Sequence, residues 1–195
     1  MSKIDLAFAV LGQRPIPADH GYVLYGALSH AIPSLHASHG IGIHPIRGQQ
    51  IGDRRLSLTA HSRLVVRVDT DHIGQVLPLA GQQLDITGSK VRVGVPQVWS
   101  LPPAPALRSR LVTTKNCQDQ SRFESELRRQ LDVLDVSQAV IVTVPKRRTL
   151  RIKDKEVVGY EVILEGLTAA ESLNIQELGL GGRRHMGCGV FTALR

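Results

Sequence analysis

The chain ends in the stretch Glu177-Leu-Gly-Leu-Gly-Gly-Arg-Arg-His-Met-Gly-Cys-Gly-Val-Phe-Thr-Ala-Leu-Arg195, where five glycines surround Arg183 and Arg184. Glycine adopts positive φ and lets another backbone come close. Such a loop, placed between a helix and a terminal strand, can turn N–H groups toward a phosphate chain, and arginines supply matching charge. Dinucleotide and Walker patterns do not fit, because Arg184 replaces a required glycine and no Gly-Lys-Ser/Thr ending follows. The stretch predicts a glycine-rich, anion-binding loop.

The second half of the chain follows the order strand, helix, strand, strand, helix, strand, with this loop before the last strand. Apolar and alternating runs predict strands at 107–113, 139–144, 150–152, 157–164 and 190–194. Two capping boxes, Ser121/Glu124 and Thr168/Glu171, predict helix starts. The helix that begins near Ser121 should bury the face formed by Phe123, Leu127, Leu131 and Leu134.

The first half of the chain has the same order of elements. Strands are expected at 4–10, 41–47, 56–68, 84–87 and 91–93, and helices at 22–32 and 73–80. Asp19 is a suitable N-cap for the first helix and Pro33 should end it. Pro96, Pro102, Pro103 and Pro105 predict a stiff connector. The fold class is therefore α+β: two tandem ferredoxin-like βαββαβ modules, residues 1–95 and 106–195.

Composition narrows the class of partner. The chain has 195 residues, 42% of them hydrophobic, and a formal net charge of +7, which favours a polyanion such as nucleic acid. No long apolar run suggests a membrane, and the first residues lack the continuous apolar core of a signal peptide. The two cysteines form no disulfide framework or metal-ligand spacing. We expect a cytoplasmic protein without metal or cofactor.

Basic residues concentrate in the hairpin Pro145-Lys-Arg-Arg-Thr-Leu-Arg-Ile-Lys153, where alternation predicts Arg151 and Lys153 on one side. Such a hairpin can enter the groove of an RNA stem-loop and contact phosphates. Aromatic residues make up only 4% of the chain, which argues against a base-stacking platform. Four other arginines are expected to be ordinary surface charge: Arg63, Arg67, Arg108 and Arg110.

These motifs together resemble a known family. The segments are Gly21-Tyr-Val-Leu-Tyr-Gly-Ala-Leu-Ser29, Ser34-Leu-His36, Gly42-Ile-His-Pro-Ile-Arg-Gly48, Arg147-Arg-Thr-Leu-Arg-Ile-Lys153 and Gly181-Gly-Arg-Arg-His-Met-Gly-Cys-Gly-Val-Phe191. The combination resembles the RAMP superfamily of CRISPR-associated RNA-binding proteins. Within it, the chain is most similar to the branch that cuts CRISPR precursor transcripts within their repeats in type I systems.

The resemblance implies a metal-independent endoribonuclease that uses the ribose 2′-hydroxyl as nucleophile and leaves a 2′,3′-cyclic phosphate and a 5′-hydroxyl. Relatives carry their catalytic histidine on the first helix or in the loop after it. Tyr25 stands at the helix position, so His36 in the loop is the expected general base or acid, with Tyr25 as helper and His20 and His39 as reserves. His44 should be structural. The implied RNA contacts are Arg147, Arg148, Arg151, Lys153, Arg183, Arg184, Gly181, Gly182 and Gly187.

Two readings of function stay open at this point. The preferred one is the repeat-cleaving enzyme, a monomer or homodimer that binds a repeat stem-loop and could keep its product. The alternative is a non-catalytic RNA-binding subunit of a type I effector complex, which Tyr25 keeps open. A small-molecule-binding regulator fits the charge and the arginine loop poorly.

Overall fold

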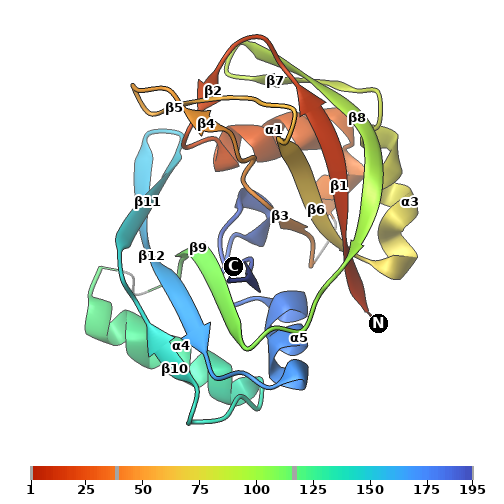
Figure 1. Cartoon of the computed structure of the whole chain (residues 1–195). Coiled ribbons are helices and arrows are strands. Elements are labelled where there is room, and N and C mark those ends of the chain that lie inside the picture. The colour runs from red at the N-terminus through yellow and green to blue at the C-terminus, as the bar shows by residue number, and fades with distance from the viewer. Residues whose placement is uncertain (1, 38–39, 116–117, 195) are drawn as a thin grey trace. The chain divides into compact units, whose positions relative to one another are not determined.

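The computed structural model describes residues 2–37, 40–115 and 118–194. The chain forms two compact units, Met1–Ser100 and Leu101–Arg195, and each is described by itself (Figure 1). Across the described ranges, no helix combines the length and the apolar character needed to cross a membrane.

The N-terminal unit is built on one antiparallel sheet with the order β3-β6-β1-β8-β7. Its strands are β1 (Lys3–Leu11), β3 (Gly42–Ile43), β6 (Arg63–Asp69), β7 (Gln83–Ile86) and β8 (Ser89–Ser100). Its helices are α1 (Gly21–Ala31), α2 (Ser34–Ala37) and α3 (Ile73–Val76), with 3₁₀ turns at Thr70–His72 and Leu77–Leu79. A small second sheet has the order β2-β5-β4, formed by Ile16–Pro17, Arg55–Ser57 and Gln49–Gln50. The order β3-β6-β1-β8 is the ferredoxin-like arrangement, with β7 added at the edge.

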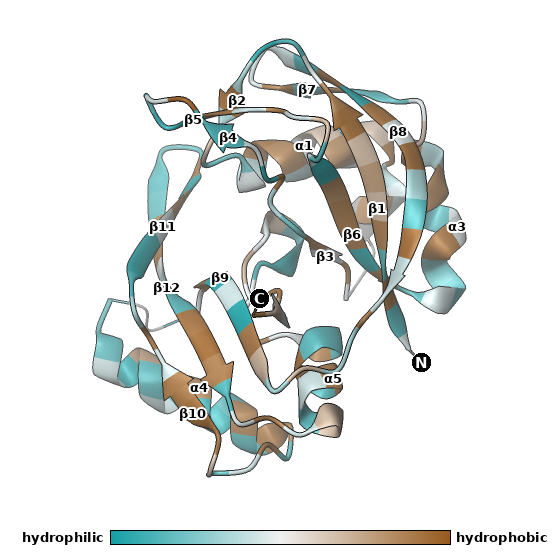
Figure 2. Ribbon diagram, in the orientation of Figure 1, coloured by the Kyte–Doolittle hydropathy of each residue, from teal (hydrophilic) through white to brown (hydrophobic). Residues whose placement is uncertain are grey.

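The core of this unit lies between the sheet and α1. Leu24 and Leu28 are buried one helical turn apart, and the alternate residues Leu6 and Phe8 of β1 are fully buried in the same cluster. The apolar residues along β1 and β6 stand out in Figure 2. α1 ends before Pro33, with the Ile32 N–H donating to the Leu28 carbonyl. The helix predicted at 22–32 is confirmed.

Several predicted boundaries in this unit are wrong. The run 56–68 forms two strands, β5 and β6, because the Thr59 N–H and the Ser62 Oγ close a turn between them. The run 41–47 keeps only β3, since Pro45 has no N–H to donate. The N-cap of α1 is His20 and not Asp19. The predicted connector at Pro96 belongs to β8, which pairs with β1 as far as Ser100 across a bulge.

The C-terminal unit repeats the arrangement with the sheet order β10-β12-β9-β13, and β11 pairs with β12. Its strands are β9 (Ala106–Val112), β10 (Ile141–Thr143), β11 (Arg147–Ile152), β12 (Lys155–Glu165) and β13 (Thr192–Ala193). Its helices are α4 (Gln120–Val133) and α5 (Ala169–Leu178), followed by a 3₁₀ turn at Arg184–Met186. The ferredoxin-like prediction is therefore confirmed by strand order in both halves.

The helices of this unit pack through the residues that the apolar pattern predicted. Phe123, Leu127 and Leu131 of α4 and Ile175 of α5 are buried in one cluster with the sheet. The Thr168/Glu171 capping box is present. The Ser121/Glu124 box is not, because Asp119 is the N-cap: its side chain accepts the Arg122 N–H and the Ser121 hydroxyl.

Candidate nucleic-acid interface

The glycine-rich segment after α5 is folded tightly onto the end of β9. The Gly189 N–H donates to the Leu111 carbonyl at 2.7 Å, and the Gly182 N–H donates to the Thr113 carbonyl at 2.9 Å. Gly189 has φ +64°, and a Cβ there would overlap the Leu180 carbonyl oxygen. Positive φ and this close approach both require glycine. Glycine at position 189 therefore lets the segment fold back closely on itself beside β9.

The N–H groups of the three glycines expected to contact RNA already have partners within the protein. Those of Gly181, Gly182 and Gly187 donate to the Gln130 side chain, the Thr113 carbonyl and the Arg184 carbonyl. These three donors are satisfied within the protein and are not available to an anion in this conformation. The expectation that the N–H groups of Gly181, Gly182 and Gly187 point toward a phosphate is therefore wrong. A contact of these glycines with RNA by other atoms stays a proposal.

The two arginines of the loop have different surroundings. Arg183 is exposed, adopts a left-handed backbone conformation with φ 61°, and directs Nη1 at the Thr113 Oγ1, 3.4 Å away. Arg184 is half-buried and its guanidinium donates to the Leu178 carbonyl at the end of α5. A cation bonded to the last carbonyls of a helix stabilises that end.

Substitution of the two arginines is expected to separate binding from stability. The RNA contact that the resemblance implies for Arg183 predicts that Arg183→Ala weakens RNA binding and flattens its salt dependence, by about 0.7–0.9 log units per log unit of salt for one lost phosphate contact. Arg184→Ala should also lower the thermal midpoint, because the α5 end loses its cap. Titrations of repeat RNA at several salt concentrations, with melting curves of both variants, measure this. An equal fall in the thermal midpoint of the two variants would contradict the separate roles of Arg183 and Arg184.

The basic hairpin is formed by β11 and β12, with Lys153 in the connecting turn at φ 53°. Arg147 and Arg151 are exposed on β11. Lys153 occupies the turn, so strand alternation does not extend to it, and its place on the Arg151 side stays a prediction. Leu150 of β11 is buried against Leu111 and Cys188, with Ile152 and Met186 at the margin. This apolar cluster joins the hairpin to the glycine-rich segment.

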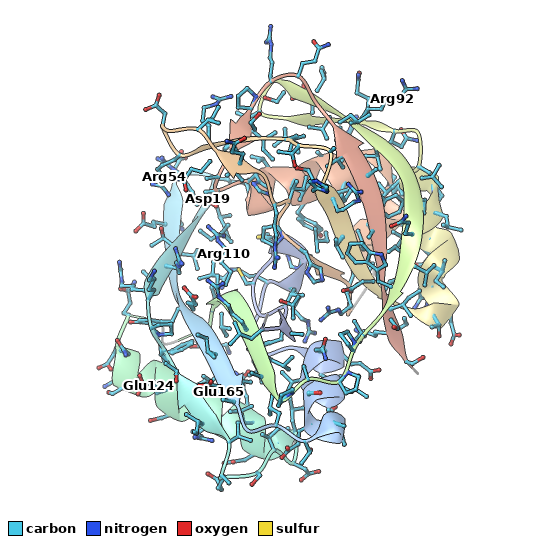
Figure 3. All side chains as sticks on the ribbon, in the orientation of Figure 1. Asp19, Arg54, Arg92, Arg110, Glu124 and Glu165 are labelled. Atoms are coloured by element: carbon cyan, nitrogen blue, oxygen red, sulfur yellow. The ribbon has the colours of Figure 1, made fainter. Side chains whose placement is uncertain are left out.

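Glu161 of β12 holds two arginines on the C-terminal sheet. Arg108 Nη2 lies 2.6 Å and Arg148 Nη2 lies 2.7 Å from its two carboxylate oxygens. Burial opposes ionisation, but the hydrogen bonds from Arg148 and Arg108 outweigh it and keep the pKa of Glu161 below its ordinary value. Two guanidiniums around one carboxylate leave a net positive charge. Arg108 is thus held in place by an ion pair with Glu161, unlike an ordinary surface arginine. Arg110, two residues along β9, projects from the strand in Figure 3.

A pocket of about 890 Å³ lies beside the glycine-rich segment. It is lined by the segment after β9, the middle of α4, the start of β12 and the loop itself: Thr113, Thr114, Lys115, Gln118, Glu126, Arg129, Gln130, Glu156, Val157, Val158, Gly181, Gly182 and Arg183. The hydrogen bonds from Arg129 and Gln130 lower the pKa of Glu126 to about 2. The charged residues that line the pocket are the cations Lys115, Arg129 and Arg183 and the carboxylates Glu126 and Glu156. Glu126 is already paired with Arg129.

The histidines of the N-terminal unit have contrasting positions. His20 is 1% exposed; its Nε2 accepts the Ile46 N–H at 2.9 Å, so Nδ1 carries the proton and donates to the Pro17 carbonyl at 2.8 Å. Both ring nitrogens are occupied, which argues against His20 as a catalytic residue. The backbone of His36 lies in α2, while its side chain and all of His39 lie outside the described residues. Tyr25 is half-buried on α1 and packs partly against the core.

Comparison with known proteins places these features in a family. A family model described as Cas6 Crispr matches residues 4–195. The chain belongs to the Cas6 family. It is 40% identical over 191 residues to the CRISPR-associated endonuclease Cas6 of Myxococcus xanthus (strain DK1622), covering 98% of this chain and 81% of that protein.

Two solved structures share the Cas6 fold seen here. A structure titled "An RAMP protein binding different RNA substrates" matches with a TM-score of 0.70 and 15% identity over all of both chains. The product of a Cas6-related gene from Pyrococcus furiosus matches with a TM-score of 0.69 and 14% identity, over 100% of this chain and 99% of that one. At these identities the likeness concerns the fold.

This Cas6 chain also contains a buried charge cluster that sequence reasoning missed. Arg67 is 2% exposed and donates from Nε and Nη2 to the two Asp5 oxygens, each at 2.8 Å. Arg67 is therefore not surface charge. His44 Nε2 lies 3.5 Å from Asp5 Oδ1, at the long limit of such a contact. Burial lowers the pKa of His44, which fits its expected structural role. Asp5 and Arg67 face each other across β1 and β6, a pairing that only strand register reveals.

Proposed function

We propose that this chain is a metal-independent endoribonuclease that cleaves CRISPR precursor RNA within its repeats. The observation that carries the proposal is its 40% identity, over nearly its whole length, to a protein named as a CRISPR-associated endonuclease. The arginines of β9, β11 and the glycine-rich loop supply the positive surface that a folded RNA requires. In this proposal the C-terminal module holds the repeat stem-loop and the N-terminal module carries the catalytic residues.

The proposed reaction is a transesterification. The 2′-oxygen at the cut site loses its proton to a base and attacks the adjacent phosphorus, the bond to the 5′-oxygen breaks, and that oxygen takes up a proton. The products are a 2′,3′-cyclic phosphate and a 5′-hydroxyl. His36 serves as general base or acid because imidazole titrates near neutral pH, and Tyr25 orients the phosphate or shares proton transfer. An arginine stabilises the extra negative charge of the phosphorane.

The test uses a labelled repeat RNA in EDTA beside the same RNA with a 2′-deoxyribose at the cut site. The all-ribose RNA should be cleaved to a product that bears a cyclic phosphate, and the deoxy RNA should be bound but not cleaved. Cleavage of the deoxy RNA, or a strict requirement for a divalent metal, would contradict the mechanism. Tight binding of both RNAs without any cleavage would favour the non-catalytic RNA-binding subunit, which the tyrosine at position 25 keeps as the second candidate.

A further inference from the structure

We propose that Gln130 of α4 is a positioning residue for RNA binding, which fixes the glycine-rich loop and through it Arg183. The proposal rests on the proposed function, because it concerns how the loop meets the repeat RNA. Gln130 is half-buried, and its side chain bridges the helix to the loop. Its Oε1 accepts the Gly181 N–H at 2.7 Å, and its Nε2 donates to Glu126 Oε1 at 2.8 Å.

The orientation of the Gln130 amide is determined by its two partners. A backbone N–H can only donate, so the oxygen must face Gly181. An ionised carboxylate can only accept, so the nitrogen must face Glu126. Glutamine carries one acceptor and one donor on the same terminal group. Position 130 therefore calls for a neutral side chain with both functions, which neither an ionised glutamate nor a leucine offers.

Glu126 is itself held in place. Arg129 donates to its two oxygens at 2.7 and 2.8 Å, one helical turn away on α4. The charged groups that face this part of the pocket from other elements are Lys115 after β9, Glu156 on β12 and Arg183 on the loop. A second carboxylate beside Glu126 would therefore meet a site in which the available Arg129 is already paired.

The loop is held from the β9 side as well. The Gly182 N–H donates to the Thr113 carbonyl at 2.9 Å, and the Thr113 hydroxyl donates to the Gly182 carbonyl at 3.3 Å. A Cβ on Gly181 would stand 2.5 Å from the Thr113 oxygen, so the loop fits closely here. Gln130 and Thr113 thus clamp the two residues before Arg183 from opposite elements. Without Gln130 only the contacts with Thr113 hold the loop. Arg183 would then lose conformational entropy when RNA binds, and this loss would weaken binding.

The decisive variant is Gln130→Glu, measured against pH. At pH 8 the introduced carboxylate would have no donor for Glu126 and would be repelled by it, which should draw the side chain away from the Gly181 N–H. RNA affinity should then fall by about tenfold, the effect of one lost hydrogen bond to a charged group. Two neighbouring carboxylates raise the pKa of one of them, so near pH 5 the pair should take up a proton. The shared proton restores a donor toward Glu126, and the affinity relative to the wild type should recover. Gln130→Leu should lose affinity at both pH values.

The matched control is Gln120→Glu. Gln120 also donates from Nε2 to a glutamate four residues on, Glu124, at 2.9 Å on the same helix, but the pair is exposed and lies outside the pocket. This variant should keep wild-type affinity at both pH values. Gln130→Glu should raise the KM and leave the single-turnover rate at saturating RNA unchanged. Wild-type affinity for Gln130→Glu at pH 8, or a loss without recovery at pH 5, would overturn the inference. Failure of the wild type itself to bind repeat RNA would instead refute the proposed function.

Discussion

His36→Ala should slow cleavage of repeat RNA by about 10²–10⁴-fold, the usual contribution of a general acid or base, and leave RNA affinity nearly intact. The residue before His36 packs into the core of the N-terminal unit. α2 follows Pro33, the Leu35 N–H donates to the Ile32 carbonyl at 3.0 Å, and Leu35 is 4% exposed within the core. Single-turnover rates at saturating protein, with separate binding titrations, measure the two quantities.

His30→Ala is the matched control for this variant. His30 lies in the last turn of α1, a few residues before His36, and is exposed. Its replacement should change neither rate nor affinity. A wild-type cleavage rate for His36→Ala would show that the catalytic assignment is wrong. Equal losses of rate and affinity would point to a role of His36 in binding.

Asp5→Asn should destabilise the N-terminal unit by about 3–5 kcal/mol, because it leaves the buried Arg67 guanidinium without a counter-charge. The amide keeps the shape of the side chain, so the loss reports charge and not volume. Denaturant unfolding of the wild type and the variant measures the difference. The control is Asp85→Asn, which removes the partner of an exposed pair with Lys90 and should change stability little. An Asp5→Asn variant as stable as the wild type would contradict the role of the cluster.

The same cluster predicts loss of stability in acid. Burial opposes ionisation, but Arg67 and His44 hold the pKa of Asp5 well below its ordinary value in the folded protein. The unfolded state therefore binds its proton first, and this contribution is lost as the pH falls below about 4. Burial lowers the pKa of His44, so its contribution declines already below about 6.5. Asp5→Asn should be less sensitive to acid than the wild type below pH ~4.

Local periodicity predicted the elements whose environment is set by their neighbours in sequence. The helix α1, the α4 face and the Thr168 cap came out as expected, because each depends on residues three or four apart. Boundaries failed where a distant partner decides them. Pro96 joins β8 because β1 lies beside it. No spacing rule within one segment contains this information.

The candidate site shows the same contrast between features set by neighbouring residues and features set by distant ones. The arginines of the hairpin and the loop could be found from composition alone, since charge is local. The burial of Arg67, the sharing of Glu161 by Arg108 and Arg148, and the occupied ring of His20 depend on residues brought together from separate elements. The glycines were recognised, but their N–H groups bond to β9, α4 and the loop itself, which the sequence does not reveal.

The apolar cluster of Leu111, Leu150 and Cys188 has a consequence for what an RNA must look like to bind. It ties the arginine-bearing hairpin and the arginine-bearing loop to the same strand, so neither can adjust without disturbing a packed interior. Under the proposed function, we therefore expect a folded repeat to meet the hairpin and the loop as one preformed surface, not as two arms that move independently.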